Sequence, residues 1–194
     1  RVDLMSINVG YGFVQFVDRS VPDNLFDRIE RIRKDLAKDM GFIVPPIHIT
    51  DNVRLEHNVY TILIKGVEIA RGKLMINKLM AIDYTGTSEE IDGIAVQDPV
   101  FGIPAYWISE KQSLDAEEAG YVVVDPLTVM STHITEIIKR HSHELLGRQA
   151  VKRLLDNIEE EQPVLFEEIT PDVLPIGIIQ KVLQNLLRER VSIR

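Results

Sequence analysis

Hydrophobic residues follow strand and helix periodicities in turn along the first part of the chain. Alternation at Met5–Val9 predicts a strand, and the chain is expected to resume an extended path at Phe13–Val17. Apolar residues at every third or fourth position between Leu25 and Met40 predict a helix. Gly41 is suited to end that helix, and Pro45–Pro46 prevent its continuation.

The next hundred residues mix the two periodicities. Short strands are predicted at Ile47–Thr50, Tyr60–Ile64, Val67–Arg71, Leu79–Asp83, Ala105–Ile108 and Tyr121–Val124, the last as a buried strand. Leu114–Ala119 is predicted as a short helix, and a long helix is expected from Asp125–Pro126 to Gly147. Tyr84–Gln97, rich in Gly, Thr and Glu, is predicted as a mobile loop.

Beyond Gly147 the pattern is only helical, with apolar stripes at Val151–Ile158 and Ile178–Leu187. The composition therefore shifts near Gly147 from mixed helix and strand to all-α. The order strand, helix, strand, hairpin is typical of α/β or α+β folds, and the whole chain is predicted to be an α+β protein of several subdomains.

The most unusual segment is Asp98–Trp107, which holds two of the nine prolines and the only tryptophan. Its prolines and Gly102 rule out a regular helix, yet it is too apolar for a simple solvated loop. Two interpretations stay open, a loop buried at a domain junction or a loop offered to a partner.

Composition narrows the possible partners. The 194 residues carry a net charge of −8, which argues against nucleic acid, because that ligand needs a concentrated basic face. The absence of cysteine excludes disulfides and thiolate chemistry and fits a cytosolic setting. The sequence shows no apolar run of membrane-spanning length and no signal peptide.

No catalytic pattern is found. The sequence has no phosphate-binding glycine loop and no nucleophile elbow. His141 and His143, two apart, do not share a helix face, and His133 is expected to be a hydrogen-bonded core residue. Acidic residues that are adjacent in sequence direct their side chains apart, so they indicate solvated faces and not an acid–base pair. We therefore predict no enzyme activity, no cofactor and no metal.

The segment Asp98–Trp107 resembles a signature of the cytoplasmic domain of the FlhA family, the export-gate proteins of flagellar and virulence type III secretion. Further segments resemble motifs of that family in the expected order: Ile32–Ala37, Gly41–Pro46, Ile49–Asn52, Lys65–Gly72, Ser131–Ile134, Glu144–Gln149 and Val182–Leu187. The resemblance covers nearly the whole chain and is strongest to the flagellar branch.

The resemblance implies three subdomains. Residues 1–76 and 126–145 would form a thioredoxin- or ferredoxin-like α/β subdomain, 77–125 a small inserted α/β subdomain, and 146–194 a truncated helical subdomain. An N-terminal membrane portion and a last cytoplasmic subdomain are expected outside the chain. We also expect relative motion of the subdomains, with hinges near Gly72–Asn77, Asp125–Pro126 and Gly147.

The resemblance also implies a function. The domain would be a docking platform at the cytoplasmic face of the bacterial inner membrane, at the flagellar basal body. Its expected partners are export chaperones loaded with late substrates, the export ATPase complex with its stalk, other export-gate components and, in the full-length protein, further copies in a ring of nine. Chaperones would dock at Asp98, Phe101 and Thr132, in a shallow hollow lined by Ile82 and Val124.

Three alternatives stay open at this stage. One is the export gate of a virulence secretion system, and a remote one is an enzyme on a small α/β scaffold. The third is an RNA-binding module, which needs aromatic residues interleaved with basic ones on its sheet. The predicted hairpin Thr61–Arg71 contains no aromatic residue, which weighs against RNA.

We expect the 194-residue chain to be monomeric or weakly associating, because the resemblance implies that the ring is nucleated by the membrane portion. Light scattering of the purified chain measures this directly. A stable nonamer of the isolated chain would contradict it.

Overall fold

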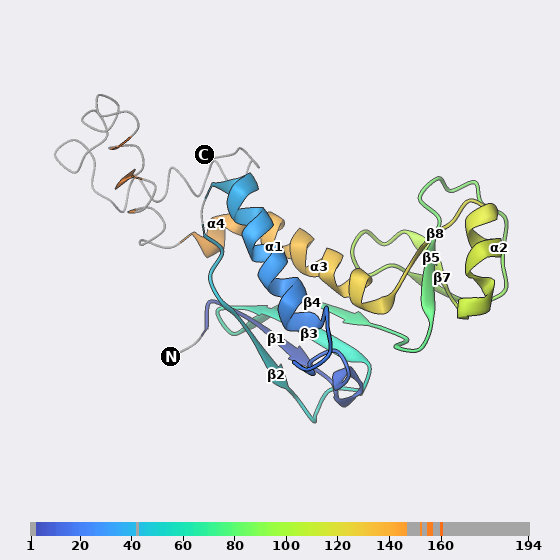
Figure 1. Cartoon of the computed structure of the whole chain (residues 1–194), viewed down its shortest axis with the longest axis horizontal. Helices are drawn as coiled ribbons and strands as arrows, with labels where there is room; N and C mark the ends of the chain where they lie inside the picture. The colour runs from blue at the N-terminus through green and yellow to red at the C-terminus, as the bar shows by residue number, and fades with distance from the viewer. Residues whose placement is uncertain (1–2, 42, 147–151, 153–154, 157–159, 161–194) are drawn as a thin grey trace. The chain divides into compact units, whose positions relative to one another are not determined.

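The computed structural model describes residues 3–41 and 43–146, together with residues 152, 155, 156 and 160 (Figure 1). The chain divides into two compact units, residues 1–28 with 47–136, and residues 29–46 with 137–194. All the strands of the described residues belong to the first unit. The mixed α+β class is confirmed, whereas the thioredoxin- or ferredoxin-like topology and the three-subdomain division stay predictions.

The first sheet has the order β2-β1-β3-β4, formed by β1 (Met5–Val9), β2 (Ile47–Asp51), β3 (Val59–Ile64) and β4 (Val67–Lys73). Strand β1 runs parallel to β2 and antiparallel to β3, and β3 and β4 form the predicted hairpin. Met5, Ile7 and Val9 are fully buried, as their alternation requires.

The predicted extended path at Phe13–Val17 is wrong. Tyr11–Phe13 forms a 3-10 turn, η1, in which the Phe13 N–H donates to the Gly10 carbonyl at 3.1 Å. A side chain at Gly10 would place its Cβ 2.0 Å from the Glu56 carbonyl oxygen, so this close backbone approach requires glycine. The turn places the Phe13 ring in the core.

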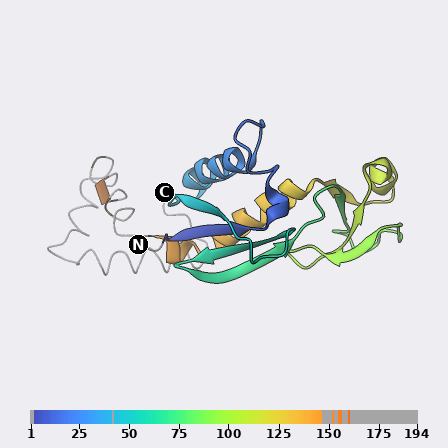
Figure 2. The same cartoon turned by 90° about the horizontal axis from the view of Figure 1, so that it is seen from below.

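The second sheet has the order β6-β7-β5-β8 and is antiparallel throughout (Figure 2). Its strands are β5 (Leu79–Ile82), β6 (Ile94–Gln97), β7 (Pro104–Ile108) and β8 (Val122–Val124). The prediction of a loop from Tyr84 to Gln97 is therefore wrong at its end, because pairing with β7 makes β6 a strand. Strand β8 is not buried as predicted, since it lies at the sheet edge and Val122 is exposed.

The pairing register gives the second sheet two different faces. Ile94, Trp107, Met80 and Val124 stand opposite one another across the four strands and so share one face. The other face carries Ala81 and Ile108, which form a small core with Ala116 and Tyr121. Ala116 belongs to α2 (Ser113–Glu118), which follows the 3-10 turn η2 (Glu110–Gln112). Helix α2 thus covers only one face of this sheet.

Helix α1 (Leu25–Met40) begins in the first unit and continues in the second, and it ends at Gly41, whose φ of 78° is left-handed. The long helix predicted from Asp125–Pro126 to Gly147 is interrupted. It forms α3 (Pro126–Arg140), and α4 (Ser142–Leu145) follows. His141 leaves the helical region at φ −110° and ψ 18°, and the Ser142 hydroxyl bonds the Lys139 carbonyl, in competition with the helical backbone.

The helices predicted after Gly147, and the hinge near it, lie outside the described residues apart from a few isolated positions. The other two expected hinges stay predictions.

A buried hydrogen bond joins the first sheet to α3. The Tyr60 Oη lies 2.6 Å from His133 Nδ1, and both residues are buried, as expected for a core histidine. The Tyr60 ring stands edge-on to Phe13, with the ring centroids 6.0 Å apart. Burial and the nearby negative charge of Asp98 raise the pKa of Tyr60, so its hydroxyl stays protonated.

We expect Tyr60→Phe to lower the free energy of unfolding by about 1–3 kcal/mol, because it removes one partner of a buried hydrogen bond while keeping the ring. Urea titration measures the change. Tyr11→Phe is the matched control, because Tyr11 is 78% exposed. Equal stability of the two variants would show that the buried bond contributes nothing.

Candidate functional site

The loop between β6 and β7 closes around one carboxylate. Asp98 is buried, and its two oxygens accept backbone N–H bonds from Val100 at 3.0 Å, Phe101 at 2.9 Å and Ile103 at 2.6 Å. The Asp98 main chain also bonds Ile103 and Gly102. Gly102 has a φ of 70°, which glycine adopts without strain. The loop is therefore a tight turn held from inside by Asp98.

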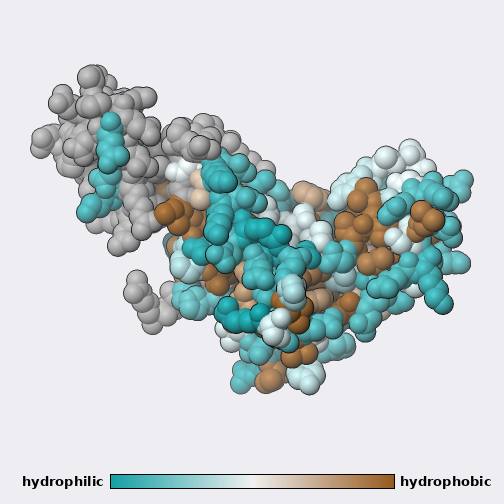
Figure 3. All heavy atoms as spheres, in the orientation of Figure 1, coloured by the Kyte–Doolittle hydropathy of each residue, from teal (hydrophilic) through white to brown (hydrophobic). Residues whose placement is uncertain are grey.

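This turn decides which apolar side chains face solvent. Val100 and Trp107 are buried, whereas Phe101 is 50% exposed. The sequence leaves two interpretations of the segment, a buried loop or a loop offered to a partner. Each interpretation applies to different residues, since Val100 and Trp107 belong to the core and Phe101 lies at the surface. Figure 3 shows apolar residues gathered on the surface of the part of the first unit that carries the second sheet.

A small hollow lies beside Phe101. It has a volume of about 30 Å³ and is lined by residues of the loop, of β5 and β8, of the segment after β5 and of α3: Ile82, Tyr84, Asp98, Val100, Phe101, Val124, Thr128, Val129 and Thr132. All five residues predicted from the resemblance thus meet at one place. Small-molecule sites enclose roughly 300–1,000 Å³, so this hollow suits the tip of a protein side chain instead.

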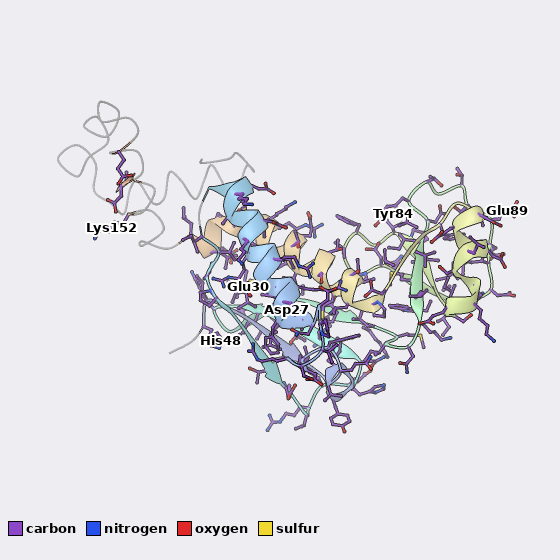
Figure 4. The ribbon with its side chains drawn as sticks, viewed as in Figure 1. Asp27, Glu30, His48, Tyr84, Glu89 and Lys152 are labelled. Carbon is purple, nitrogen blue, oxygen red and sulfur yellow. The ribbon has the colours of Figure 1, made fainter. Side chains whose placement is uncertain are left out.

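Four lining residues were not predicted. Thr128 and Val129 precede Thr132 by four and three positions, and helical spacing from Thr132 was a signal that could have found them. Tyr84 lies in a segment without periodicity, so no sequence signal pointed to it. Figure 4 shows Tyr84 on the loop beside the second sheet. Burial, with the charge of Asp98, raises the pKa of Tyr84, which is therefore neutral at physiological pH.

The start of α3 is fixed by polar contacts next to the hollow. The Thr128 hydroxyl bonds the Asp125 carboxylate and receives a bond from Arg28 Nη1 at 2.9 Å. Arg28 also pairs with Asp125 at 3.6 Å and with Asp23 at 3.0 Å. The Thr132 hydroxyl donates to the Thr128 carbonyl at 2.9 Å. These contacts therefore fix the start of the helix that forms one wall of the hollow.

Within the described part of the chain, no group of histidine, cysteine, aspartate or glutamate side chains is arranged to hold a metal ion. Among the same residues, no helix has the length and apolarity needed to cross a membrane.

Comparison with known proteins gives one consistent family. A sequence model of the FHIPEP family matches residues 1–194. The chain is 47% identical over 194 residues to the flagellar biosynthesis protein FlhA of Bacillus subtilis (strain 168), covering 100% of this chain and 29% of that protein. The corresponding protein of Treponema pallidum (strain Nichols) is 44% identical over 193 residues, with 100% and 27% covered. The chain thus spans less than a third of these relatives.

Solved structures share this fold, among them the nonameric EscV cytosolic domain from the type III secretion system, with a TM-score of 0.63 at 19% identity over 100% of this chain and 55% of that one. The Chlamydia pneumoniae CdsV protein superposes with a TM-score of 0.79 at 23% identity, over 100% of this chain and 56% of that one. CdsV in complex with CdsO gives 0.78 at 25%, over 100% and 57%. The nonameric EPEC SctV-C gives 0.68 at 18%, over 100% and 56%.

Asp98 stabilises the loop from inside. Its carboxylate is committed to the loop backbone, so Asp98→Ala leaves the loop donors unpaired and is expected to cost about 1–3 kcal/mol of unfolding free energy.

Thermal melts with hydrogen exchange at the Val100, Phe101 and Ile103 amides measure this effect. Asp83→Ala serves as a control, since Asp83 holds its own turn on the loop after β5. Unchanged protection of the three amides in Asp98→Ala would contradict the role given to this carboxylate.

Proposed function

Since the chain belongs to the FHIPEP family, we propose that it acts as a cytoplasmic docking platform of the flagellar type III protein export gate. The observation that carries this proposal is the exposed Phe101 at the rim of a preformed apolar hollow. In the proposed mechanism, export chaperones loaded with late substrates dock there, and cargo passes from them toward the membrane channel.

Physical reasoning supports Phe101 as the anchor of the docking site. A rigid aromatic side chain at the centre of an interface can contribute roughly 2 kcal/mol or more. Phe101 stands on a turn whose backbone is already fixed, so little conformational entropy is lost on binding. Ile82 and Val124 supply the apolar floor, Thr132 lies at the rim, and Asp98 acts by positioning the loop.

The wider partners belong to the same proposal. Binding of a partner protein is supported by the complex of CdsV with CdsO. We extend the proposal to the export ATPase complex with its stalk and to other gate components. Assembly of the full-length protein as a ring of nine is supported by nonameric SctV-C. The proposed location is the cytoplasmic face of the bacterial inner membrane, at the flagellar basal body.

The flagellar assignment is favoured over the virulence one by sequence. The flagellar relatives are 47% and 44% identical to the chain, whereas the secretion structures described above are 18–25% identical. Membership of this family also confirms that the chain is not an enzyme, because its curated relatives are flagellar biosynthesis proteins.

We expect Phe101→Ala to melt within a few degrees of the wild type and to weaken chaperone binding at least about tenfold, because the side chain is half exposed and anchors the interface. Thr132→Met is expected to behave in the same way, by filling the hollow. The measurements are a thermal melt and a calorimetric titration with a cognate chaperone–substrate complex.

Tyr11→Ala is the matched control, since it removes another exposed aromatic side chain, one that does not line the hollow. Wild-type affinity in Phe101→Ala would refute the docking proposal. Truncation of a core phenylalanine to alanine costs about 3–5 kcal/mol of unfolding free energy. Unfolding of Phe101→Ala would therefore place Phe101 in the core instead.

A further inference from the structure

A second and larger concavity lies in the first unit, apart from the hollow beside Phe101. Its volume is about 600 Å³, and it shares no lining residue with that hollow. Its walls come from the end of β4, including Arg71 and Lys73, and from the second sheet, including Ile94, Val96, Trp107 and Met80. We propose that this groove binds an extended, uncharged polypeptide segment with alternating apolar residues, which pairs as an additional strand with the free edge of β6.

The apolar wall follows from the strand register. Ile94 stands opposite Trp107, and Trp107 stands opposite Met80, so the three side chains form one row on the sheet face that α2 does not cover. Trp107 and Met80 are buried, and Ile94 at the edge is 46% exposed. Val96 lies on the same face, two residues from Ile94. A strand added beside β6 would set every second side chain next to Ile94 and Val96, which continue this row to the edge.

The backbone of β6 has an unpaired side. In the part of the chain that the structure describes, β6 pairs with β7 alone. The Asp98 N–H donates to the Ile103 carbonyl at 2.9 Å, so Asp98 opposite Ile103 is a hydrogen-bonded position. Antiparallel ladders alternate, so Val96 and Ile94 also bond toward β7, whereas Ala95 and Gln97 direct their N–H and C=O to the free edge.

Pro104 supports the same assignment independently. Gln97 stands opposite Pro104, which has no N–H and therefore gives β6 no donor. The Pro104 carbonyl is used on its other side, where it accepts the Asp83 N–H at 3.1 Å. Gln97 is thus at a non-hydrogen-bonded position, and its backbone N–H and C=O point away from β7, toward the free edge of β6.

The composition of β6 also distinguishes its edge. Exposed edges are usually protected by charge, proline or a bulge. Strand β4 carries Glu68, Arg71 and Lys73 and lies beside a bulge at Ile62–Leu63, and β2 carries Asp51. Strand β8 is uncharged, but it has three residues and contacts α2. Strand β6 reads Ile-Ala-Val-Gln, with no charge and no proline.

An extended peptide fits these features better than other occupants do. The four residues of β6 offer an edge of roughly 13 Å, enough for two outward-facing residues to form a short ladder. A small apolar molecule would leave the donors and acceptors of Ala95 and Gln97 unpaired. The edge of a second folded copy would have to enter a groove that β4 bounds on its other side.

The probe for the test is a soluble, end-capped, uncharged heptapeptide in which valine and threonine alternate between terminal serines. We expect saturable binding with a Kd between about 1 µM and 1 mM. The Ala95 and Gln97 amides should gain hydrogen-exchange protection, while the Val96 amide is protected already. The same peptide with N-methylated alternate amides should bind roughly tenfold more weakly or worse.

Ala95→Pro is the decisive variant, because it removes an outward N–H without breaking the β6–β7 ladder. It should weaken binding by about tenfold or more, whereas the control Ala95→Ser should bind as the wild type does. Ile94→Lys places a charge at a half-exposed position of the groove and should also weaken peptide binding. It replaces the proline variant if Ala95→Pro has a lowered melting temperature. Val67→Lys on β4 is its control away from the groove.

Several results would overturn the proposal. Equal binding of the N-methylated peptide would indicate an apolar groove without strand pairing. Unprotected Ala95 and Gln97 amides, or no binding of the probe, would also refute it. Sedimentation that shows a dimer abolished by Ala95→Pro would assign the edge to a second copy. Phe101→Ala should leave peptide binding unchanged, so this proposal and the docking proposal can fail separately.

Discussion

The buried carboxylate of Asp98 determines the shape of the loop on which the hollow depends. Three backbone N–H groups converge on it, so the chain between β6 and β7 has one stable path. That path buries Val100 and exposes Phe101 in consecutive positions. An unpaired buried carboxylate would be costly, and hydrogen bonding within the loop removes that cost. The same bonds leave the Phe101 ring at the rim of the hollow.

Buried side chains near Asp98 hold α3, which forms the other wall of the hollow, in place. The negative charge of Asp98 acts on Tyr60, whose hydroxyl bonds His133 on α3, and Thr132 is the next residue toward the start of that helix. Only glycine at position 72 leaves room for this ring, because a Cβ at Gly72 would come within 2.4 Å of it. Tyr60 and His133 therefore connect the first sheet to α3 through buried polar groups, which require specific partners and so specify one arrangement.

The second sheet explains why two recognition features occur in a small region. One face packs against α2 in a small core, and the opposite face carries Met80, Trp107, Ile82 and Val124. The hollow uses this face near β8, and the groove uses it near β6. Gln97 and Pro99 line the groove while Asp98 between them lines the hollow. A segment bound at β6 would therefore lie next to the loop that positions Phe101.

Periodicity in the sequence was enough to predict β1 and α1, because each buries one face and repeats its apolar residues accordingly. Strands β3 and β4 were predicted as a hairpin through the turn at Gly66. The ordered motifs likewise led to the correct family and to five residues that meet in one hollow. Strand β6 was missed, because its four residues, none of them charged, are too few to show a clear alternation. Only hydrogen bonding to β7 makes them a strand. The break at His141 and the turn at Tyr11–Phe13 also depend on local backbone contacts that no periodicity records. Only the tertiary structure decided that Asp98 is buried while Phe101 is exposed, because the closure of β6 on β7 brings the three N–H groups to one carboxylate.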